Sequence, residues 1–300
     1  MRVFVTGASG WIGSATVPHL LAAGHEVVGL ARSDASADRL AVLGAAAHRG
    51  SLDDLESLRA GARQADAVIH LAFKHDFSDY AGAGRTERAV VQAFVDELAG
   101  TGRSLLLASG LAGAPGRVLT ERDASAFSGP DAPRGGSEGL ALDAAARGVA
   151  PVALRFAATV HGVGDHGFVA QLVRIARERG VSGYVGDGTS RWPAVHVGDA
   201  GRVVALALDK APGGTVVHAV GEEGVRHREM AEAIGRVVGV PVASVDPADA
   251  AEHFGWLGGF WGMDAVASSE LTRELLGWEP AGPTLLEDLA AGAYDHVARG

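Results

Sequence analysis

The first thirteen residues constrain this chain most, because a short apolar run leads directly into three evenly spaced glycines. Residues 3–5 read Val-Phe-Val, a β-favouring run, and Gly7, Gly10 and Gly13 follow at three-residue spacing. Residues 14–23 then predict a helix. A strand, a tight glycine turn and a helix N-terminus together form a site where backbone N–H groups and the helix dipole attract a pyrophosphate.

Glycine-rich turns also link strands to helices without binding anything, so the triplet alone is a weak signal. Here it opens the chain, lies between a strand and a helix, and is followed by a second apolar strand at residues 25–31, His-Glu-Val-Val-Gly-Leu-Ala. This context favours nucleotide binding over a purely structural turn.

Composition excludes several classes of protein. The 300 residues carry a formal net charge of −10, which argues against nucleic-acid and anionic-membrane partners. The absence of cysteine excludes disulfides, thiolate nucleophiles and cysteine-ligated metals. We find no signal peptide and no apolar stretch of about eighteen residues, so we expect a cytoplasmic protein.

Short apolar strands alternate with helices through the first half of the chain. We predict strands at residues 45–48, 67–72, 104–108 and 151–156, and helices at 35–43, from 52 onward with Ser51 or Asp53 as its cap, at 86–99 and at 137–147. This alternation predicts an α/β fold with a doubly wound parallel sheet covered on both faces.

The alternation of predicted strands and helices becomes less regular beyond about residue 160. Helices at residues 168–179, 197–208, 227–238 and 271–276 alternate there with loops rich in Gly and Pro. We therefore expect a dinucleotide-binding domain over residues 1–160 and a smaller substrate-binding lobe over residues 161–300, interleaved and with an approximate boundary.

Five segments in order along the chain carry a resemblance to a known family. They are Thr6-Gly-Ala-Ser-Gly-Trp-Ile-Gly13, Asp66-Ala-Val-Ile-His-Leu-Ala72, the segment from Arg155 to Gly162, Pro193-Ala-Val-His-Val-Gly-Asp199 and Leu276-Gly-Trp-Glu-Pro280. The chain resembles the extended short-chain dehydrogenase/reductase family, the NAD(P)-dependent epimerase/dehydratase group. That resemblance implies a Rossmann sheet with a small C-terminal substrate lobe.

The chain departs from this family at the catalytic motif. The family uses Ser or Thr together with Tyr-x-x-x-Lys, whereas none of the three tyrosines here is followed by lysine four residues later. At the matching place the chain reads Arg134-Gly-Gly-Ser-Glu138, so Arg134 holds the tyrosine position and Glu138 the lysine position. The serine position is kept as Ser109. The chain thus resembles an atypical branch of the family.

The resemblance also implies which residues bind the cofactor. The glycine turn contributes Thr6, Gly7, Ser9, Gly10, Trp11, Ile12 and Gly13, and the strand end beside it contributes Leu71, Ala72 and Phe73. Asp53 would bind the adenine amino group, although its context equally suits a helix cap.

Arg32 and Ser33 follow the second strand, where such folds read the adenosine ribose. A guanidinium with a neighbouring hydroxyl suits a 2′-phosphate, so we predict NADP. Asp34 keeps NAD possible, and a solvated surface role for Arg32 is the alternative.

Reduction of a carbonyl needs a proton donor and a group that stabilises the developing alkoxide. In the family a tyrosine donates, with a lysine that lowers its pKa. Ser109 can bind the oxygen but is a weak acid, and Arg134 can stabilise the oxyanion but cannot donate a proton. Lys74 and His75 emerge at the active edge and can donate, though His75 can equally be an exposed loop residue.

Residues of the second half complete the predicted site. His161 and His166 lie after the strand ending near residue 156, and Arg191 and Trp192 occupy a position that faces substrate in the family. Trp256 belongs to an aromatic cluster with Phe254, Phe260 and Trp261, which suggests an apolar cover over the pocket. Packing within the lobe is the alternative for Trp192 and for this cluster. The histidine spacing predicts no metal site.

The first hypothesis is an NADP-dependent reductase of a small, apolar or aromatic carbonyl or related unsaturated compound. The alternatives are a non-catalytic NAD(P)-binding redox sensor or structural module, and a nucleotide-sugar epimerase or dehydratase. The missing tyrosine counts against the last, because that reaction needs a strong base. The family often forms dimers, for which helices 86–99 and 137–147 are the candidates.

Overall fold

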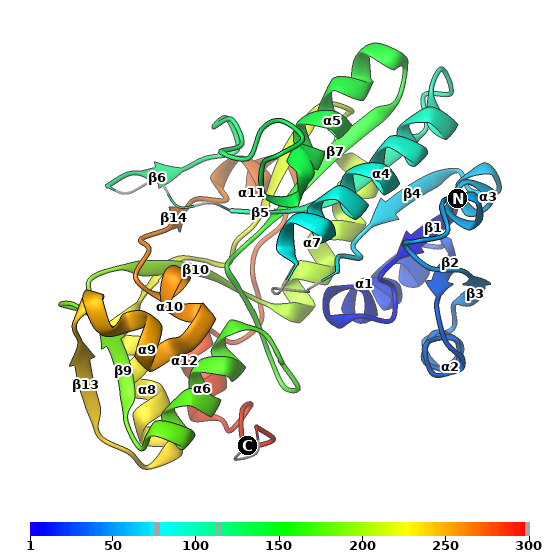
Figure 1. The fold of residues 1–300 in the computed structure, drawn as a ribbon. Helices are drawn as coiled ribbons and strands as arrows, with labels where there is room; N and C mark the ends of the chain where they lie inside the picture. Colours follow the sequence, from blue (N-terminus) through cyan, green and yellow to red (C-terminus); the bar gives the residue numbers. More distant parts are fainter. Residues whose placement is uncertain (75–78, 112, 114–115, 298–300) are drawn as a thin grey trace.

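A seven-stranded parallel sheet forms the centre of the molecule (Figure 1). The computed structural model describes residues 1–74, 79–111, 113 and 116–297. The strand order across the sheet is β11-β7-β5-β4-β1-β2-β3. Their bounds are β1 (Arg2–Thr6), β2 (Glu26–Ala31), β3 (Ala46–Arg49), β4 (Ala67–His70), β5 (Ser104–Gly110), β7 (Ala150–Phe156) and β11 (Thr215–Ala219).

Helices cover both faces of this sheet. Successive side chains of a strand point to opposite faces, and here the side chains on both faces are apolar. Val3 and Val5 pack into one buried cluster, with α1 (Trp11–Ala22), α2 (Asp34–Val42), α7 (Val197–Lys210) and α11 (Glu270–Leu276). Phe4 points into the other, with α3 (Leu55–Arg63), α4 (Tyr80–Leu98) and α5 (Ser137–Asp143). The doubly wound fold is therefore confirmed.

The second half of the chain builds a smaller lobe with its own core. It contains the three-stranded sheet β12-β10-β8 and the pair β13-β9. An aromatic centre that includes Trp192, Phe254 and Trp261 is buried within it. The elements of the lobe are β8 (Thr159–His161), α6 (Phe168–Arg179), β9 (Ser182–Val185), β10 (Arg191–His196), β12 (Glu222–Arg226), α8 (His227–Val238), β13 (Val242–Val245), α9 (Ala250–Phe254), α10 (Gly258–Trp261) and α12 (Leu285–Ala290).

The chain crosses between the two parts more than once. β11, α7 and α11 come from the second half yet belong to the large sheet and its cover, and β14 (Val266–Ala267) pairs with β6 (Val118–Leu119). The division near residue 160 stays a prediction. No helix in the described part of the chain is long and apolar enough to cross a membrane.

Three predicted boundaries need correction. α4 begins at Tyr80 rather than at residue 86, and the predicted helix 137–147 divides into α5 and the 3-10 helix η2 (Ala144–Arg147). α3 begins at Leu55, where Asp54 accepts from the backbone N–H of Ser57. The predicted start near residue 52, with Ser51 or Asp53 as the cap, is therefore wrong. Dimerisation through the α4 and α5 region stays a prediction.

Candidate active site

The carboxyl ends of parallel strands β1, β4 and β5 meet at one edge of the sheet and bring the predicted site residues together. β1 ends at Thr6, β4 at His70 and β5 one residue past Ser109. In open α/β sheets, ligands bind at this edge. Leu71, Ala72 and Phe73 continue from β4 along the same edge.

The glycine turn fits the pyrophosphate of a dinucleotide. Gly7 has φ 72°, and a Cβ on it would lie 2.7 Å from the backbone N of Ala72. Gly13 packs even more tightly, because its Cβ would collide with the carbonyl oxygen of Gly7. α1 starts from Gly10 with no side-chain cap, so its first N–H groups, next to Ser9 and Trp11, can bind phosphate oxygens.

Two arginines, Arg32 and Arg49, lie at the end of the site where adenosine is predicted to bind. Arg32 is exposed, and the Ser33 hydroxyl caps α2 by accepting from the backbone N–H of Ser36 at 3.2 Å. The guanidinium of Arg49 donates to the Asp34 carboxylate at 2.5 Å. The negative charge that would favour the NAD ribose is thus already paired with an arginine.

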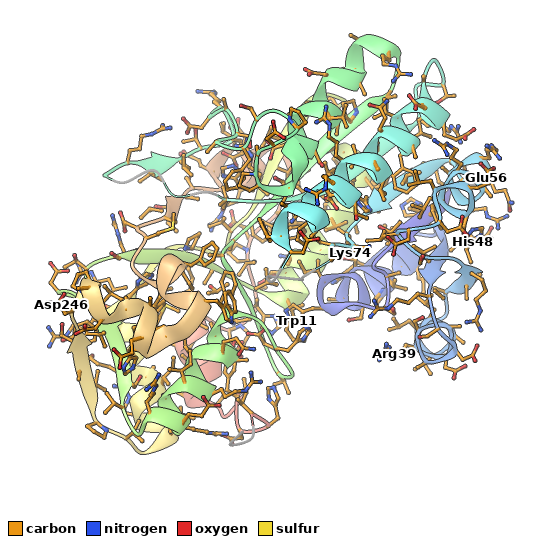
Figure 2. All side chains as sticks on the ribbon, in the orientation of Figure 1. Trp11, Arg39, His48, Glu56, Lys74 and Asp246 are labelled. Atoms are coloured by element: carbon orange, nitrogen blue, oxygen red, sulfur yellow. The ribbon has the colours of Figure 1, made fainter. Side chains whose placement is uncertain are left out.

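Lys74 and Asp53 pair with each other. The ammonium of Lys74, labelled in Figure 2, lies 2.5 Å from the carboxylate of Asp53. Asp53 is thus an ion-pair partner of Lys74 and does not cap α3. The predicted roles of Lys74 in proton transfer and of Asp53 in adenine binding stay predictions, and His75 lies outside the described residues.

A left-handed turn holds Arg134, the residue that the resemblance aligns with the family's tyrosine. Arg134 has φ 57° and ψ 23°, and Gly135 and Gly136 continue in the same conformation within the 3-10 helix η1 (Pro133–Gly136). Arg134 is the one non-glycine residue with positive φ in the described parts of the chain. Such a conformation costs about 1–2 kcal/mol for a residue with a Cβ and is retained where the surroundings impose it.

Contacts of the Arg134 guanidinium hold the residue in this left-handed conformation. Arg134 Nη2 donates to Glu87 Oε1 at 2.9 Å and to the carbonyl oxygen of Ala108 at 3.0 Å. The guanidinium also lies 4.4 Å from the centre of the Phe73 ring. The Ser137 hydroxyl donates to the Arg134 carbonyl at 2.6 Å and closes the turn. The side chain is thereby directed toward the carboxyl ends of β4 and β5.

A buried polar chain connects Arg134 to the glycine turn. His70 Nε2 lies 3.2 Å from Glu87 Oε2, and His70 Nδ1 lies 2.5 Å from the Thr6 hydroxyl. His70 thus contacts Glu87 through one ring nitrogen and Thr6 through the other, and the donor and acceptor roles depend on the tautomer of the ring. Burial raises the pKa of Glu87, but His70 and Arg134 outweigh burial, so this pKa lies below its usual value.

Glu138, which the resemblance aligns with the family's lysine, belongs to a second ion pair. Arg155 Nη2 donates to Glu138 Oε1 at 2.6 Å, and its Nε also contacts the same carboxylate. Arg155 Nη1 donates to the carbonyl oxygen of Asp123 at 2.8 Å. Both side chains are almost completely buried. No lysine-like cation is therefore available to a ligand from position 138.

Ser109 and Arg134 line one small cavity, together with Glu138, Ser125 and Phe127. The structure thus brings these two residues together, and their catalytic roles stay predictions. A wider pocket lies elsewhere, near Asp246 on the outer side of the C-terminal lobe (Figure 2). It is lined by residues such as Arg179, Asp249 and Glu252, none of which belongs to the sheet edge.

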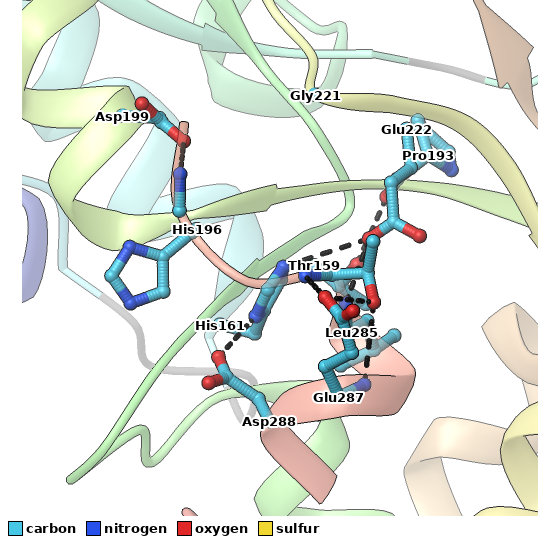
Figure 3. Close-up of polar contacts among 12 residues, drawn as sticks. Thr159, His161, Pro193, His196, Asp199, Gly221, Glu222, Leu285, Glu287 and Asp288 are labelled. Atoms are coloured by element: carbon cyan, nitrogen blue, oxygen red, sulfur yellow. Dashed lines mark hydrogen bonds and ion pairs between the residues drawn. The ribbon is translucent and has the colours of Figure 1, made fainter. Parts of the chain in front are cut away.

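His161 is completely buried and joins β8 to α12. Its Nδ1 lies 2.6 Å from Asp288 Oδ2, and its Nε2 lies 3.8 Å from Glu222 Oε1 (Figure 3). Burial lowers the pKa of His161 despite the Asp288 carboxylate. Its predicted contact with substrate stays a prediction, and its observed contacts are those of an anchor for the C-terminal helix.

His166 lies where the lobe meets the glycine turn. Its exposed ring stands edge-on to the ring of Trp11, with 6.0 Å between the ring centres. Trp11 Nε1 donates to the carbonyl oxygen of Val160 at 2.7 Å. The loop that leads into α6 is therefore held directly beside the predicted cofactor turn.

The remaining predicted substrate residues occupy different environments. Arg191 contacts Asp264 through its backbone N–H, at 2.8 Å, and through its guanidinium. Trp192 is 3% exposed within the lobe core, the packing position that was its alternative role. Trp256 is 46% exposed and contacts Phe168, as does Phe260. In the described segments, no group of three or more His, Asp or Glu side chains is placed to hold a metal ion.

Sequence reasoning missed His70, Glu87 and Arg155 as parts of the site. Glu87 carried a detectable signal, because it lies on the same helical stripe as Val90, Val91 and Phe94, which are all buried. An acid on such a stripe requires a buried partner. The sequence contains no comparable pattern that identifies the partner as Arg134.

The comparisons with known proteins agree with this geometry. A family model described as the NAD dependent epimerase/dehydratase family matches residues 3–115. An uncharacterized protein of Schizosaccharomyces pombe is 46% identical over 296 residues, 98% of this chain and 100% of that protein. A 4-hydroxy-2-methyl-3-oxo-4-farnesyl-3,4-dihydroquinoline-1-oxide ketoreductase of Stigmatella aurantiaca is 28% identical over 231 residues, 72% of this chain and 67% of the relative.

Among solved structures, a dTDP-glucose 4,6-dehydratase of Streptomyces venezuelae with NAD bound has the same fold. The TM-score is 0.78 at 21% identity, and the match covers 98% of this chain and 96% of that one. At this identity the likeness concerns the fold alone.

Proposed function

Because the chain belongs to the NAD-dependent epimerase/dehydratase group of the extended short-chain dehydrogenases/reductases, we propose that it is an NADP-dependent reductase of a small apolar or aromatic carbonyl or related unsaturated compound. The observation that carries this proposal is the pairing of Ser109 with Arg134 in one cavity at the carboxyl edge of the sheet.

This pair offers hydrogen-bond donors to a substrate oxygen. Of the three guanidinium nitrogens of Arg134, only Nη2 has an acceptor among the described residues, so Nε and Nη1 can donate to a ligand. The Ser109 hydroxyl adds a further donor. A carbonyl oxygen accepts such bonds, and they strengthen as negative charge develops on it. A nicotinamide cofactor, when bound at the glycine turn, would supply the hydride for the reduction.

Charge balance favours a neutral carbonyl compound over a phosphorylated one. Arg134 is compensated by Glu87, and Arg155 is compensated by Glu138, so the cavity carries no excess positive charge. Guanidinium groups also cannot act as a base, which an epimerase or dehydratase needs to remove a hydroxyl proton. These features support reduction over sugar epimerisation.

Aromatic side chains next to the cofactor turn support an apolar or aromatic substrate. Phe168 starts α6 directly after the loop in which His166 contacts Trp11. The Phe168 ring stacks on Phe260 and contacts Trp256, and both of these are more than 40% exposed. Exposed aromatic rings beside a cofactor site suit apolar ligands.

The proposal of NADP over NAD rests on charge at the end of β2. Arg32 is exposed, and the neighbouring Asp34 is paired with Arg49. We expect Arg32→Leu to lower the affinity for NADPH about tenfold or more while leaving that for NADH unchanged. Fluorescence titration measures both. The matched control is Arg39→Leu, which removes an exposed arginine from α2 without touching this end of the sheet. Equal loss of NADH and NADPH affinity in Arg32→Leu would contradict the assignment.

The test of the reductase itself is NADPH oxidation over a panel of ketones, imines and enones that carry aliphatic or aromatic groups. We expect turnover on at least one of them. Tight NADPH binding without turnover on any member of the panel would instead favour a non-catalytic redox sensor.

A further inference from the structure

One face of α4 presents three residues to the Arg134 turn. Tyr80, Gly84 and Glu87 are spaced four and three residues apart, so they lie on the same side of the helix. A Cβ on Gly84 would lie 2.9 Å from the backbone N of Gly135, which shows how closely the turn rests on the helix. Gly84 lies between the other two residues on α4. Glu87, which binds Arg134, lies about one turn toward the C-terminus of the helix, and Tyr80 lies about one turn toward its N-terminus.

The Tyr80 ring also lies at the edge of the sheet where the cofactor is expected. It is half-buried and stands nearly edge-on to Phe73, with ring centres 5.9 Å apart. The Arg134 guanidinium also lies over the Phe73 ring, 4.4 Å from its centre. Phe73 lies three residues past the end of β4, so Tyr80 and Arg134 both contact a side chain just beyond the carboxyl end of that strand.

We propose that Tyr80 donates the proton to the substrate oxygen, from α4 rather than from the position that Arg134 now occupies. This inference rests on the proposed reductase function. When hydride adds to the carbonyl carbon, the π electron pair of the C=O bond moves to the oxygen. The O–H bond of Tyr80 then breaks and its proton bonds to that oxygen. The resulting phenolate regains a proton from water.

The charged groups around Tyr80 suit this role. Burial raises the pKa of the Tyr80 phenol, the Arg134 charge lowers it, and the Glu87 charge raises it, with a net result above the usual value. The phenol therefore stays protonated at neutral pH, which is the form that a general acid needs. Arg134 stabilises the phenolate after transfer, as a nearby cation does for other acidic phenols.

The other two tyrosines have different surroundings. Tyr294 is fully buried and donates to Asp165 at 2.8 Å. Tyr184 lies on β9 in the C-terminal lobe, where the Arg228 guanidinium is 5.6 Å from its ring centre. Tyr184 is therefore a matched control, because it is a half-buried tyrosine with an arginine neighbour away from the sheet edge.

The first experiment compares Tyr80→Phe with Tyr184→Phe on any carbonyl substrate that the wild-type protein reduces. We expect Tyr80→Phe to lower kcat about 10²- to 10⁴-fold while KM and the dissociation constant for NADPH stay within about twofold. Tyr184→Phe should leave all three unchanged. If Tyr80→Phe retains the wild-type kcat, the inference fails while the reductase proposal stands. If the wild-type protein reduces nothing on the panel, the reductase proposal fails and this inference fails with it.

A second measurement needs no turnover and keeps Tyr80 in place. With ¹³C-labelled tyrosine, the chain gives three ring signals, and the phenylalanine variants assign those of Tyr80 and Tyr184, whose titration is then followed. We expect Arg134→Gln to raise the pKa of Tyr80 and Glu87→Gln to lower it, with Tyr184 unchanged in both. If neither substitution moves the Tyr80 titration, Arg134 is not its electrostatic partner and the inference is overturned.

Discussion

Arg134 and Glu138, which the resemblance aligns with the family's tyrosine and lysine, each belong to an arginine–glutamate pair, but the two pairs are not equivalent. All three nitrogens of Arg155 have acceptors or polar neighbours, and its side chain is 6% exposed. Arg134 is 20% exposed and uses a single nitrogen within the described residues. Of these two arginines, only Arg134 has a positive φ.

This contrast distinguishes a structural ion pair, Glu138–Arg155, from the pair Glu87–Arg134, in which the arginine keeps donor groups for a ligand. A fully buried and saturated pair can only contribute to stability and fold specificity. The Arg134 guanidinium is partly exposed, and a strained turn and a buried carboxylate fix its orientation. Local strain of this kind is tolerated at functional sites. We therefore expect damage to the Glu138–Arg155 pair to affect mainly stability and damage at Arg134 to affect mainly activity.

The largest expected effect on stability comes from Glu138→Leu, which leaves Arg155 buried without its counter-charge. We expect the free energy of unfolding to fall by about 3–5 kcal/mol. The double variant Glu138→Leu with Arg155→Met should recover most of this loss. Urea denaturation measures both, and Arg147→Ala, which breaks an exposed pair with Asp96, should cost less than about 1 kcal/mol. A small loss in Glu138→Leu would contradict the structural role.

Arg134→Leu tests the other side of the contrast. We expect kcat to fall about 10²- to 10³-fold, as when an oxyanion donor is removed, with a smaller loss of stability than in Glu138→Leu. The loss of stability is smaller because His70 remains as a donor to Glu87. Arg134→Lys keeps the charge but not the planar fork, so its kcat should lie between those of Arg134→Leu and the wild type. Steady-state kinetics on the substrate found in the panel measures this, and an unchanged kcat in Arg134→Leu would remove Arg134 from the mechanism.

Glu87→Gln changes how stability depends on pH. The pKa of Glu87 is lowered in the folded state, so its ionised form stabilises the fold above the usual carboxyl pKa of about 4.5. This contribution is lost as the pH falls through the folded-state pKa. We therefore expect the wild type to be more stable than Glu87→Gln at neutral pH and the difference to shrink below about pH 4.5. Urea denaturation across this range measures it, and a difference that does not change with pH would contradict the assignment.

The smallest effect is expected for Arg88→Ala. Arg88 Nη1 donates to the carbonyl oxygen of Gly135 at 2.8 Å and so supports the left-handed turn from α4. Its loss should lower the free energy of unfolding by about 1 kcal/mol, with a modest fall in kcat. Arg85→Ala removes a neighbouring exposed arginine and serves as the control. Equal effects of the two substitutions would show that the turn does not depend on Arg88.

Much of the fold was predictable because it depends on local patterns. The apolar runs at residues 3–5 and 67–70 have the composition of buried parallel strands, and the bounds of α6 and α8 follow from their apolar periodicity. The start of α4 was missed because Gly82 and Gly84 have low helix propensity. The Arg134 turn packs closely against Gly84, so position 84 favours glycine over residues of higher helix propensity.

The candidate site was predictable in part. The positions of Ser109 and Arg134 followed from order along the chain, since both lie near the carboxyl end of β5. The partners of Arg134 and Glu138 did not, because Glu87 and Arg155 are distant in sequence and meet them only through tertiary packing. The missed α4 start also hid Tyr80 from the sequence analysis, since its place on the Glu87 face exists only if the helix reaches residue 80.

The left-handed turn has a consequence for attempts to introduce the Tyr-x-x-x-Lys motif of the family. A tyrosine placed at residue 134 would inherit φ 57°, a conformation unfavourable for a bulky L-residue, and it would leave Glu87 without its guanidinium. A lysine at residue 138 would face Arg155 instead of neutralising it. Grafting Tyr-x-x-x-Lys by two substitutions should therefore yield an unstable protein rather than a conventional enzyme, and the surrounding backbone and both glutamate–arginine partnerships would have to change at the same time.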